Sequence, residues 1–427
     1  MEQKKQGFNT LLVHAGERPD PTTGASTLPI FQSTAYVFDS AEDGASRFAL
    51  EKAGNIYTRI TNPTTDVFEQ KMAAIEGGVA AVATSSGMSA QFTAITTITS
   101  AGENIVTTSY LYGGTYNAFH HLFNRFGIEV RFAAGDDPKS IESLIDSKTK
   151  VIYLETIGNP EFSVPDFEPI AEIARRHGIV LMCDNTFGCG GYLCQPINYG
   201  ANLVTHAATK WIGGHANSMG GVMVDAGNFA WDNGRYPLIA EPVESYHGVN
   251  FWERFGAAAF AVKMRCEGLR DIGACQSPFN AFLLTQGLET LALRVQRSAD
   301  NTLELAQWLE SHPKVESVSY PGLKSNKYHA LATKYLRNGY GCVLSFRVKG
   351  GSAAAASVVD NAQMLYHVAN VGDTKSLIIH PATTTHSQLT EAELVSAGVY
   401  PNLLRVSVGI EDIEDIKYDL DQALQKL

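Results

Sequence analysis

Short apolar runs alternate with helical segments between residues 66 and 225, and this alternation restricts the fold more than any other feature of the chain. The segments between the runs carry apolar residues three or four positions apart, and several end at glycine, as helices do. A strand that alternates with helices in this way pairs in parallel with the next strand. The pattern therefore predicts an α/β fold with a mostly parallel sheet, whose strands are 80–84, 103–108, 128–133, 150–155, 179–183 and 201–205.

Chemically useful side chains follow five of these strands, each at its carboxyl end. They are Ser86 with Gly87, Tyr112, Asn159, Asp184 and Lys210. The carboxyl ends of parallel strands meet at one edge of a sheet, where open α/β sheets bind ligands, so we expect these residues to share a site. One such residue at a strand end is common by chance, whereas five with complementary chemistry indicate function.

Lys210 lies in a loop of small residues after the run 201–205. A lysine amine in a partly desolvated pocket attacks carbonyl carbons, so this position favours a Schiff base with pyridoxal phosphate. Taken alone, the segment fits a surface lysine at a strand end equally well. Asp184 supports the cofactor, because a nearby carboxylate keeps its pyridine nitrogen protonated, although the residue also suits a helix or turn cap. Tyr112 suits stacking on the cofactor ring or packing in the core.

The turn at 85–89 leads from a strand into a helix and offers a place for the phosphate. The free backbone N–H groups of Gly87 and Met88 and the helix dipole favour an anion there. The hydroxyls of Ser86 and Thr209 and the guanidinium of Arg59 are further candidate donors. Many turns of this kind bind nothing, so the turn is weak evidence alone.

Composition excludes several other classes of function. The formal net charge is −11 and no Lys/Arg run occurs, which argues against a nucleic-acid partner. No signal core and no run of about eighteen apolar residues occurs, so we expect no membrane span and a cytoplasmic location. A nucleotide-binding α/β protein without covalent chemistry remains an alternative. It would use Ser86 and Gly87.

The histidines and cysteines do not indicate a metal site. His206 and His215 flank Lys210 but have no third ligand placed with them, so they are interpreted as hydrogen-bonded loop histidines, as are His380 and His386. A zinc site using Cys189 and Cys194 has the wrong spacing. The remaining thiols fit a reduced, intracellular enzyme. The chain has six cysteines: Cys183, Cys189, Cys194, Cys266, Cys275 and Cys342.

The chain divides into three regions. Residues 1–62 lack periodicity and predict an extended arm that lies on a neighbouring subunit. Residues 63–277 form the ligand-binding domain, with an aromatic insertion at 225–255 that suits a cleft or a subunit contact. Residues 278–427 form a second α/β domain, which opens with one long helix from 278 to about 312.

The sequence resembles the cysteine/methionine-metabolism family of pyridoxal-phosphate enzymes over nearly its whole length. It looks closest to the O-acetylhomoserine sulfhydrylase branch. The segments that carry the resemblance are 13–16, 111–116, 209–215, 242–247, 273–280, 370–373, 379–382 and 404–412. The resemblance implies fold type I, aspartate-aminotransferase-like, with a large domain around a mostly parallel sheet and a smaller C-terminal α/β domain.

The resemblance also implies roles for particular residues. Lys210 would be the cofactor lysine, Asp184 the partner of the pyridine nitrogen and Tyr112 the stacking ring. Thr209 would join Ser86, Gly87 and Met88 at the phosphate. Tyr57 and Arg59 would reach in from a second subunit, Arg405 and Asn370 would hold the substrate's α-carboxylate, and Asn159 would contact that carboxylate or the cofactor's phenolic oxygen.

The sequence departs from the family's pattern in two places. Ala207 stands where a serine near the phosphate is common, so one hydrogen bond to the phosphate is expected to be absent. Ala216 and Asn217 replace a more usual Gly-Thr, and nothing in the sequence explains that change.

The implied reaction is γ-replacement on O-acetyl-L-homoserine by sulfide or methanethiol, giving homocysteine or methionine and acetate. The alternatives within the family are cystathionine γ-synthase and methionine γ-lyase. Gly114 argues against the lyase, which usually has cysteine at that position. A homotetramer built from dimers with shared sites is expected.

Overall fold

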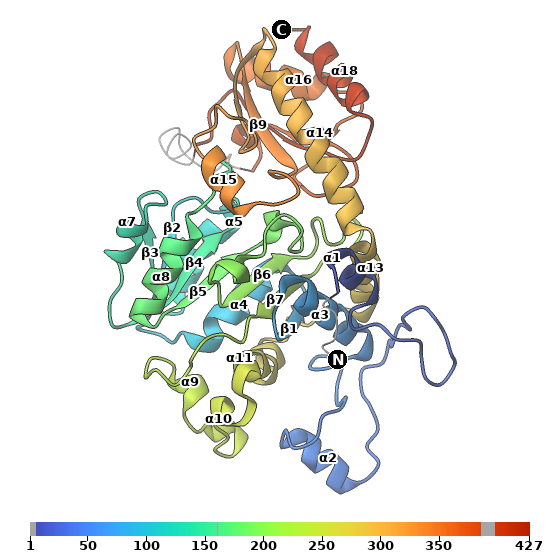
Figure 1. The fold of residues 1–427 in the computed structure, drawn as a ribbon, viewed down its shortest axis with the longest axis vertical. Helices are drawn as coiled ribbons and strands as arrows, with labels where there is room; N and C mark the ends of the chain where they lie inside the picture. The colour runs from blue at the N-terminus through green and yellow to red at the C-terminus, as the bar shows by residue number, and fades with distance from the viewer. Residues whose placement is uncertain (1–5, 160, 386–397) are drawn as a thin grey trace.

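The computed structural model describes residues 6–159, 161–385 and 398–427. These residues form two sheets, one above the other in Figure 1. The larger sheet contains β1 (Ala80–Thr84), β2 (Asn104–Thr108), β3 (Glu129–Ala133), β4 (Thr149–Glu155), β5 (Val180–Asp184), β6 (Leu203–Ala207) and β7 (Gly221–Asp225). The smaller contains β8 (Val315–Ser319), β9 (Val343–Val348), β10 (Tyr366–His367), β11 (Leu377–Ile379) and β12 (Leu403–Ser407).

The larger sheet has the strand order β1-β7-β6-β5-β4-β2-β3. β7 runs antiparallel to β1 and to β6, while the other pairs are parallel. β1 therefore points the same way as β2 to β6, and the carboxyl ends of these strands lie at one edge. The predicted α/β fold with a mostly parallel large sheet is confirmed, and the predicted strands agree with the observed ones to within two residues.

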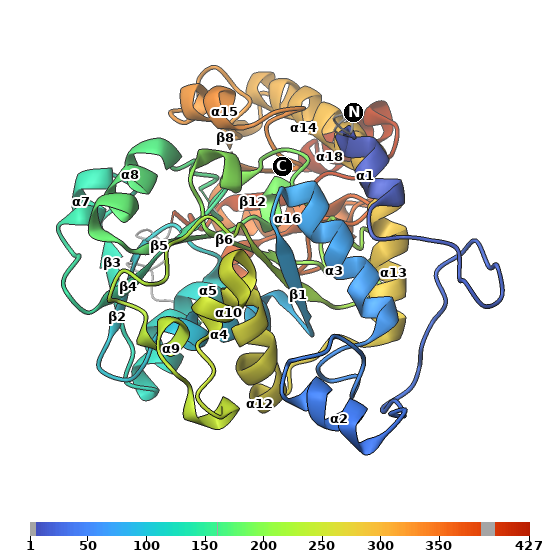
Figure 2. The same cartoon turned by 60° about the horizontal axis from the view of Figure 1, so that its bottom comes forward.

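Helices cover both faces of the larger sheet. One layer contains α3 (Pro63–Glu76), α8 (Phe167–His177) and α13 (Pro278–Glu289), and Figure 2 shows α3 and α13 side by side. The other layer contains α4 (Gly87–Ile98), α11 (Ala259–Lys263) and the π-helices η1 (Ala118–Leu122) and η6 (Met264–Leu269). Shorter elements on this domain are α5 (Gly113–Asn117), α6 (Phe123–Arg125), α7 (Pro138–Glu142), η2 (Thr186–Gly188), η3 (Pro196–Tyr199), α9 (Pro237–Ala240), η4 (Glu244–Tyr246), α10 (Phe251–Phe255), η5 (Gly256–Ala258) and α12 (Arg270–Ile272).

The aromatic insertion at 225–255 packs onto the large domain. Trp231, Tyr236 and Phe251 are buried in the same apolar cluster as the inner faces of β4 and β5. The Tyr236 hydroxyl donates to the Lys150 carbonyl at 2.6 Å and accepts from Val180 N at 2.9 Å. These three aromatic rings therefore belong to the core and do not line a cleft.

The stretch predicted to be helical from 278 to about 312 is helical, but it is divided at Thr290 into two helices where one long helix was expected. α13 ends at Glu289, and α14 (Leu291–Ser311) begins after Thr290. Residues up to Ala299 pack with the large domain, and residues from Leu305 pack with the small sheet. α14 therefore joins the two packing clusters. The predicted domain boundary at residue 278 stays a prediction.

The smaller sheet has the order β10-β11-β12-β9-β8, in which only β10 and β11 pair in parallel. Its remaining helices are α15 (His329–Tyr335), α16 (Gly351–Asn361), η7 (Pro381–Thr383) and α18 (Ile413–Leu424). One face packs on α14, α16 and α18 around Leu344, Phe346 and Val406. None of the helices that the structure describes combines the length and apolar character that a membrane span needs.

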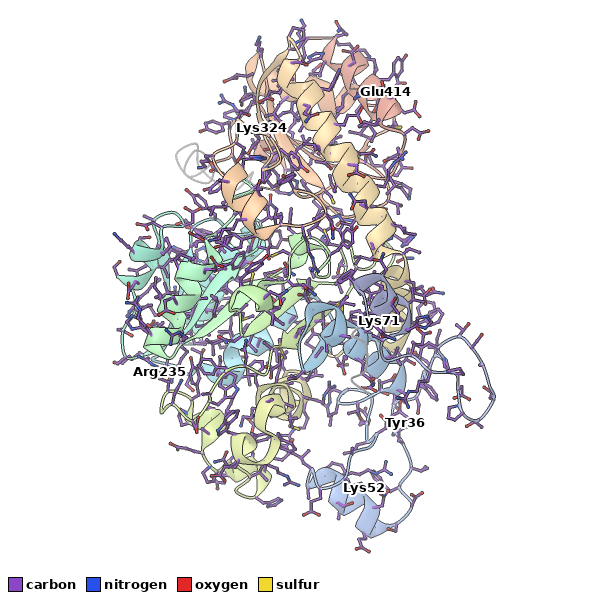
Figure 3. All side chains as sticks on the ribbon, in the orientation of Figure 1. Tyr36, Lys52, Lys71, Arg235, Lys324 and Glu414 are labelled. Carbon is purple, nitrogen blue, oxygen red and sulfur yellow. The ribbon has the colours of Figure 1, made fainter. Side chains whose placement is uncertain are left out.

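The first sixty residues are less irregular than predicted, since they contain α1 (Phe8–His14) and α2 (Ala41–Phe48). α1 lies on α3 and α13, where the buried Lys71 Nζ donates to the Leu12 and Val13 carbonyls and to Glu17. Beyond α1 the chain extends away from both sheets, and Figure 3 shows Tyr36 and Lys52 on this arm. The contact of the arm with a neighbouring subunit stays a prediction.

Asp225 at the end of β7 gives the fold a predicted pH dependence. Its carboxylate is buried and accepts from Gly227 N and Ala261 N, and burial raises the pKa of Asp225 to about 7. A carboxyl whose folded-state pKa exceeds its unfolded-state pKa stabilises the fold most below the unfolded value, and that stability is lost as pH rises through the folded value. We therefore expect the contribution of Asp225 to wild-type stability to fall between about pH 4 and about pH 7.

Asp225→Asn removes this titration. The amide can itself change stability at any single pH, so the test is the pH dependence of the difference between the two proteins. The free energy of unfolding of the variant minus that of wild type should rise by the order of 3 kcal/mol between acidic and neutral pH. Melting temperatures of both proteins across this range test the expectation. Parallel curves for the two proteins would contradict it.

Candidate active site

Lys210 lies three residues beyond β6, at the edge where the carboxyl ends meet. Its Nζ donates to Asn370 Oδ1 at 2.7 Å. Asn370 follows β10 of the smaller sheet, so this bond joins the two domains at the lysine. Burial, and secondarily the charge of Arg405, lower the pKa of Lys210. A larger fraction of the amine is therefore neutral and nucleophilic at neutral pH than for an exposed lysine.

Arg405 on β12 faces the same space from the smaller domain. It is 8% exposed, and its Nη2 lies 3.5 Å from the Asn370 carbonyl oxygen. Burial lowers the pKa of Arg405 to about 10, so the guanidinium stays charged at neutral pH. Within the described part of the chain it forms no ion pair with a carboxylate. A buried guanidinium of this kind is ready to receive an anionic ligand.

Asp184 ends β5 and is held by the turn that follows. Its Oδ1 accepts from Thr186 N at 2.9 Å and from Thr186 Oγ1 at 2.5 Å. The same Thr186 hydroxyl accepts from Ala207 N at 2.8 Å, which joins this turn to the strand before Lys210. Burial raises the pKa of Asp184, against the hydrogen bonds from Thr186 that favour the charged form. A cation beside it would stabilise the carboxylate.

Tyr112 precedes α5, and its backbone N–H donates to Glu155 Oε1 at 2.8 Å. The ring is about half exposed and lies against Gly114, where a Cβ would be 2.4 Å from Tyr112 Cε1. The Tyr112 and Arg405 side chains lie near one another. Glu155, which ends β4, is a site residue that sequence reasoning missed.

The turn at Ser86 has the geometry predicted for an anion site. Ser86 caps α4, and it exchanges hydrogen bonds with Ser89 in both directions. Among the described residues, Gly87 N and Met88 N have no acceptor. A Cβ on Gly87 would lie 2.6 Å from Ala207 Cβ, so α4 and β6 approach closely only because residue 87 is glycine.

Thr209 and Asn159 complete this edge. The Thr209 hydroxyl donates to the Gly220 carbonyl at 3.2 Å and accepts from Gly220 N at 3.1 Å, so it also holds the loop that follows Lys210. Asn159 is buried, and its Oδ1 has no hydrogen-bond partner among residues 6–159, 161–385 and 398–427. Since buried polar atoms are nearly always paired, Oδ1 indicates a place for a ligand donor. The residues at this edge therefore fit pyridoxal phosphate.

Tyr57 and Arg59 lie on the arm. The Arg59 guanidinium stacks over the Tyr57 ring, 5.5 Å from its centroid. In the described chain, neither side chain hydrogen-bonds to the other candidate residues. Their predicted contribution to a site therefore requires another subunit, and it stays a prediction.

The flanking histidines have structural partners. His206 is in β6, not in a loop, and is buried with Nε2 2.6 Å from Glu76 Oε1. His215 Nδ1 lies 2.7 Å from the Gly213 carbonyl oxygen, and His380 Nε2 lies 2.7 Å from the Pro401 carbonyl oxygen. His386 lies outside the described residues. Over the described ranges, no group of three or more metal-binding side chains gathers, and the six cysteines are free thiols.

A partly buried lysine of lowered pKa, a buried carboxylate and a helix N-terminus at one edge of a parallel sheet define a pyridoxal-phosphate enzyme of the α/β class. The chain belongs to the Cys/Met metabolism PLP-dependent enzyme family, whose model matches residues 9–425. The resemblance seen in the sequence is confirmed.

Several relatives match the chain from end to end. It is 53% identical to a homocysteine synthase of Schizosaccharomyces pombe, with complete coverage of both chains. It is 51% identical to O-acetyl-L-homoserine sulfhydrylase 1 of Thermus thermophilus, covering 98% of this chain and 99% of the relative. A crystal structure of an O-acetylhomoserine (thiol)-lyase from Campylobacter jejuni, which carries a pyridoxyl-lysine monophosphate, superposes with a TM-score of 0.95 at 39% identity, covering 98% of this chain and 100% of that one.

Proposed function

We propose that the enzyme catalyses γ-replacement on O-acetyl-L-homoserine by sulfide or methanethiol. The products are L-homocysteine or methionine, together with acetate. The observation that carries the proposal is the meeting of Lys210, Asn370 and Arg405 at one place, where Arg405 forms no ion pair with any carboxylate that the structure describes. An amine able to move protons thus lies beside a cation able to hold an amino acid's carboxylate. The relatives named homocysteine synthase and O-acetyl-L-homoserine sulfhydrylase support this choice of substrate.

Residues that follow strands of the larger sheet, together with the N-terminus of α4, would hold pyridoxal phosphate. Lys210 would bind it covalently, Asp184 would face its pyridine nitrogen, and Tyr112 would cover its ring. Asn159 Oδ1, which has no partner in the part of the chain that the structure describes, would accept a hydrogen bond from the bound ligand. Phosphate donors would be the N–H groups of Gly87 and Met88 with the hydroxyls of Ser86 and Thr209. When bound, the cofactor supplies an electron sink for charge developed at the substrate's Cα.

The protein's own groups carry the remaining steps. Arg405, with Asn370 beside it, binds the α-carboxylate and so orients the substrate with Cα toward Lys210. Lys210, which the substrate's amino group would displace from the cofactor, is then free: its Nζ takes the proton from Cα and serves proton transfer at Cβ, which allows acetate to leave from Cγ. The thiol then forms its bond to Cγ, and the same amine returns the protons. The lowered pKa of Lys210 suits this work, because the neutral amine is the base.

The assembly that this function requires is a homo-oligomer. Residues 1–62 would contact a neighbouring subunit and bring Tyr57 and Arg59 to its phosphate site, in a tetramer built from dimers. Exposed apolar side chains on the arm support a protein contact there; they include Val37, Phe48 and Tyr57. The domains would be 63–277 for the cofactor and 278–427 for the C-terminal part, and we propose a cytoplasmic location.

Product identification tests the proposed function. The purified holoenzyme is offered O-acetyl-, O-succinyl- and O-phospho-L-homoserine, each with sulfide, methanethiol or cysteine, and the products are identified by mass spectrometry. Homocysteine or methionine from the acetyl ester, with acetate in equal amount, is the expected result. Preferred formation of cystathionine, or of an α-keto acid and ammonia, would favour a synthase or a lyase instead. Family membership argues against the non-catalytic nucleotide-binding alternative.

Gly114 offers a further test of transfer against elimination. In the described conformation, any Cβ at this position would press into the Tyr112 ring at 2.4 Å, and backbone strain is not involved. Gly114→Cys and Gly114→Ala should therefore displace the ring and lower kcat for γ-replacement by about tenfold, the effect of losing about 1.4 kcal/mol of positioning. Initial rates and the ratio of keto acid to thioether measure the effect. Gly7→Ala is the control, because a Cβ there would meet no atom within 4 Å. Wild-type rates in Gly114→Cys would contradict the expectation.

A further inference from the structure

We propose that Glu155 is a positioning residue, which holds Tyr112 at the edge of the large sheet by accepting from its backbone N–H as a neutral carboxyl group. The proposal deepens the proposed function and rests on it for the role of Tyr112. The contact itself is a property of the chain and can be measured without turnover. From the sequence alone, Glu155 is the last residue of a strand, with no partner in view.

The contact crosses from one strand to the turn beyond its neighbour. β4 pairs with β2, and Tyr112 lies in the turn between β2 and α5. Glu155 Oε1 is 2.8 Å from Tyr112 N. Tyr112 is the N-cap residue of α5, and its side chain makes no capping hydrogen bond. Glu155 is 8% exposed, so little water competes for this bond. The start of α5, and with it the Tyr112 Cα, is therefore fixed to the sheet.

Glu155 stands directly beside Asp184. The two residues are partners in the register of β4 and β5, so their side chains leave the same face of the sheet. Burial first, and the charge of Asp184 second, raise the pKa of Glu155 well above its ordinary value. Asp184 accepts two hydrogen bonds from Thr186 that favour its charged form, whereas Glu155 accepts one. Two buried carboxyls so placed do not both ionise, and the proton belongs on Glu155.

The other polar groups on this face are consistent with that assignment. Tyr153, two residues earlier on β4, donates its hydroxyl to Gln91 Oε1 at 2.5 Å, and it lies near Asp184. Burial raises the pKa of Tyr153, which keeps this phenol neutral. Asp184 is thus left as the anion that faces the cofactor, while Glu155 is free to hold the backbone of Tyr112.

The ring of Tyr112 is then restrained from two sides. Glu155 fixes the backbone, and the missing Cβ of Gly114 lets the ring lie against the first turn of α5. The Tyr112 side chain also lies near Arg405 of the smaller domain. A shift of the turn would therefore move the ring relative to both the cofactor edge and the carboxylate-binding guanidinium.

Three substitutions separate this role from a charge effect or a general loss of structure. Glu155→Gln keeps a neutral acceptor oxygen at the same reach. Glu155→Met keeps the length and removes the acceptor. Glu155→Asp keeps the acid and withdraws its oxygens from Tyr112 N. Asp225→Asn is the matched control, because it makes the same acid-to-amide change at a buried position on β7, whose carboxyl end lies at the opposite edge of the sheet.

Hydrogen exchange of peptides that contain the Tyr112 amide reads the contact directly, in the protein with and without pyridoxal phosphate. We expect exchange of this amide to be about tenfold faster in Glu155→Met and Glu155→Asp, and within about twofold of wild type in Glu155→Gln and Asp225→Asn. Turnover of the holoenzyme should follow the same order. kcat should fall about tenfold in Glu155→Met and recover in Glu155→Gln, while the KM for thiol stays unchanged.

Each outcome decides the proposal. Normal exchange in a folded Glu155→Met protein would overturn it, and so would a Glu155→Gln protein that behaves like Glu155→Met, because charge would then be the requirement. Should Glu155→Met fail to fold, Glu155→Asp and Glu155→Gln carry the same comparison. A protein that binds no pyridoxal phosphate would overturn the proposed function instead, and the exchange measured without cofactor would still test Glu155.

Discussion

Lys210→Ala is expected to abolish turnover, with a loss of at least about 10²–10⁴-fold in kcat, the range typical of removing a general acid–base group. Lys210 Nζ lies at the sheet edge, 2.7 Å from Asn370 Oδ1, and burial lowers its pKa. Among the described residues, no other lysine directly follows a strand at this edge. The variant should also lose the visible absorption that pyridoxal phosphate shows when it is bound through a lysine. Steady-state rates and an absorbance spectrum of the purified protein measure both effects.

Two controls make this result specific. Lys349→Ala changes an exposed lysine of the smaller domain and should leave rate and spectrum unchanged. Borohydride reduction of the wild-type holoenzyme should add the mass of the cofactor to the peptide that carries Lys210, and to no peptide of the variant. Small primary amines should restore part of the variant's rate, since they supply the missing base. A colourless wild type, or a variant with normal turnover, would refute the assignment.

Much of the large domain could be predicted because its strands are parallel and covered on both faces. β2, β4 and β5 are buried along nearly their whole length, so each appears in the sequence as an apolar run. Residues just beyond such runs must lie at one edge, which is why Lys210 and Asp184 were found. The antiparallel direction of β7 could not be predicted from the sequence, because a buried strand has the same composition in either direction.

Contacts between distant segments could not be predicted in this way. Asn370 reaches Lys210 across 160 residues, and Arg405 stands on a different sheet, so only the family resemblance linked them to the site. Glu155 escaped notice because its partner is a backbone amide, which carries no signature in a sequence. The break between α13 and α14 at Thr290 was missed because neither glycine nor proline marks it. Packing of α13 on α3 and of α14 on the smaller sheet sets that break.

Arg405 ties the function to the interface between the two domains, and its replacement is expected to act on the substrate alone. The guanidinium is buried, remains charged at neutral pH, and has no carboxylate partner in the described residues. An arriving α-carboxylate would therefore complete a buried, bidentate ion pair. Arg405→Gln should lower kcat/KM for O-acetyl-L-homoserine about 10²–10³-fold, as expected for removing one partner of such a pair.

The measurement compares kcat/KM with cofactor affinity in the same variants. Affinity for pyridoxal phosphate should change by less than about threefold in Arg405→Gln, because Arg405 binds the substrate and not the cofactor. Arg405→Lys keeps the charge without the planar pair of donors and should recover only part of the loss. Arg347→Gln is the control, since Arg347 lies on the neighbouring β9 and pairs with Glu316 near solvent. Loss of cofactor affinity in Arg405→Gln with an unchanged KM for O-acetyl-L-homoserine would mean that the substrate's α-carboxylate binds elsewhere. If this guanidinium holds the substrate, its removal must weaken substrate binding before it weakens cofactor binding.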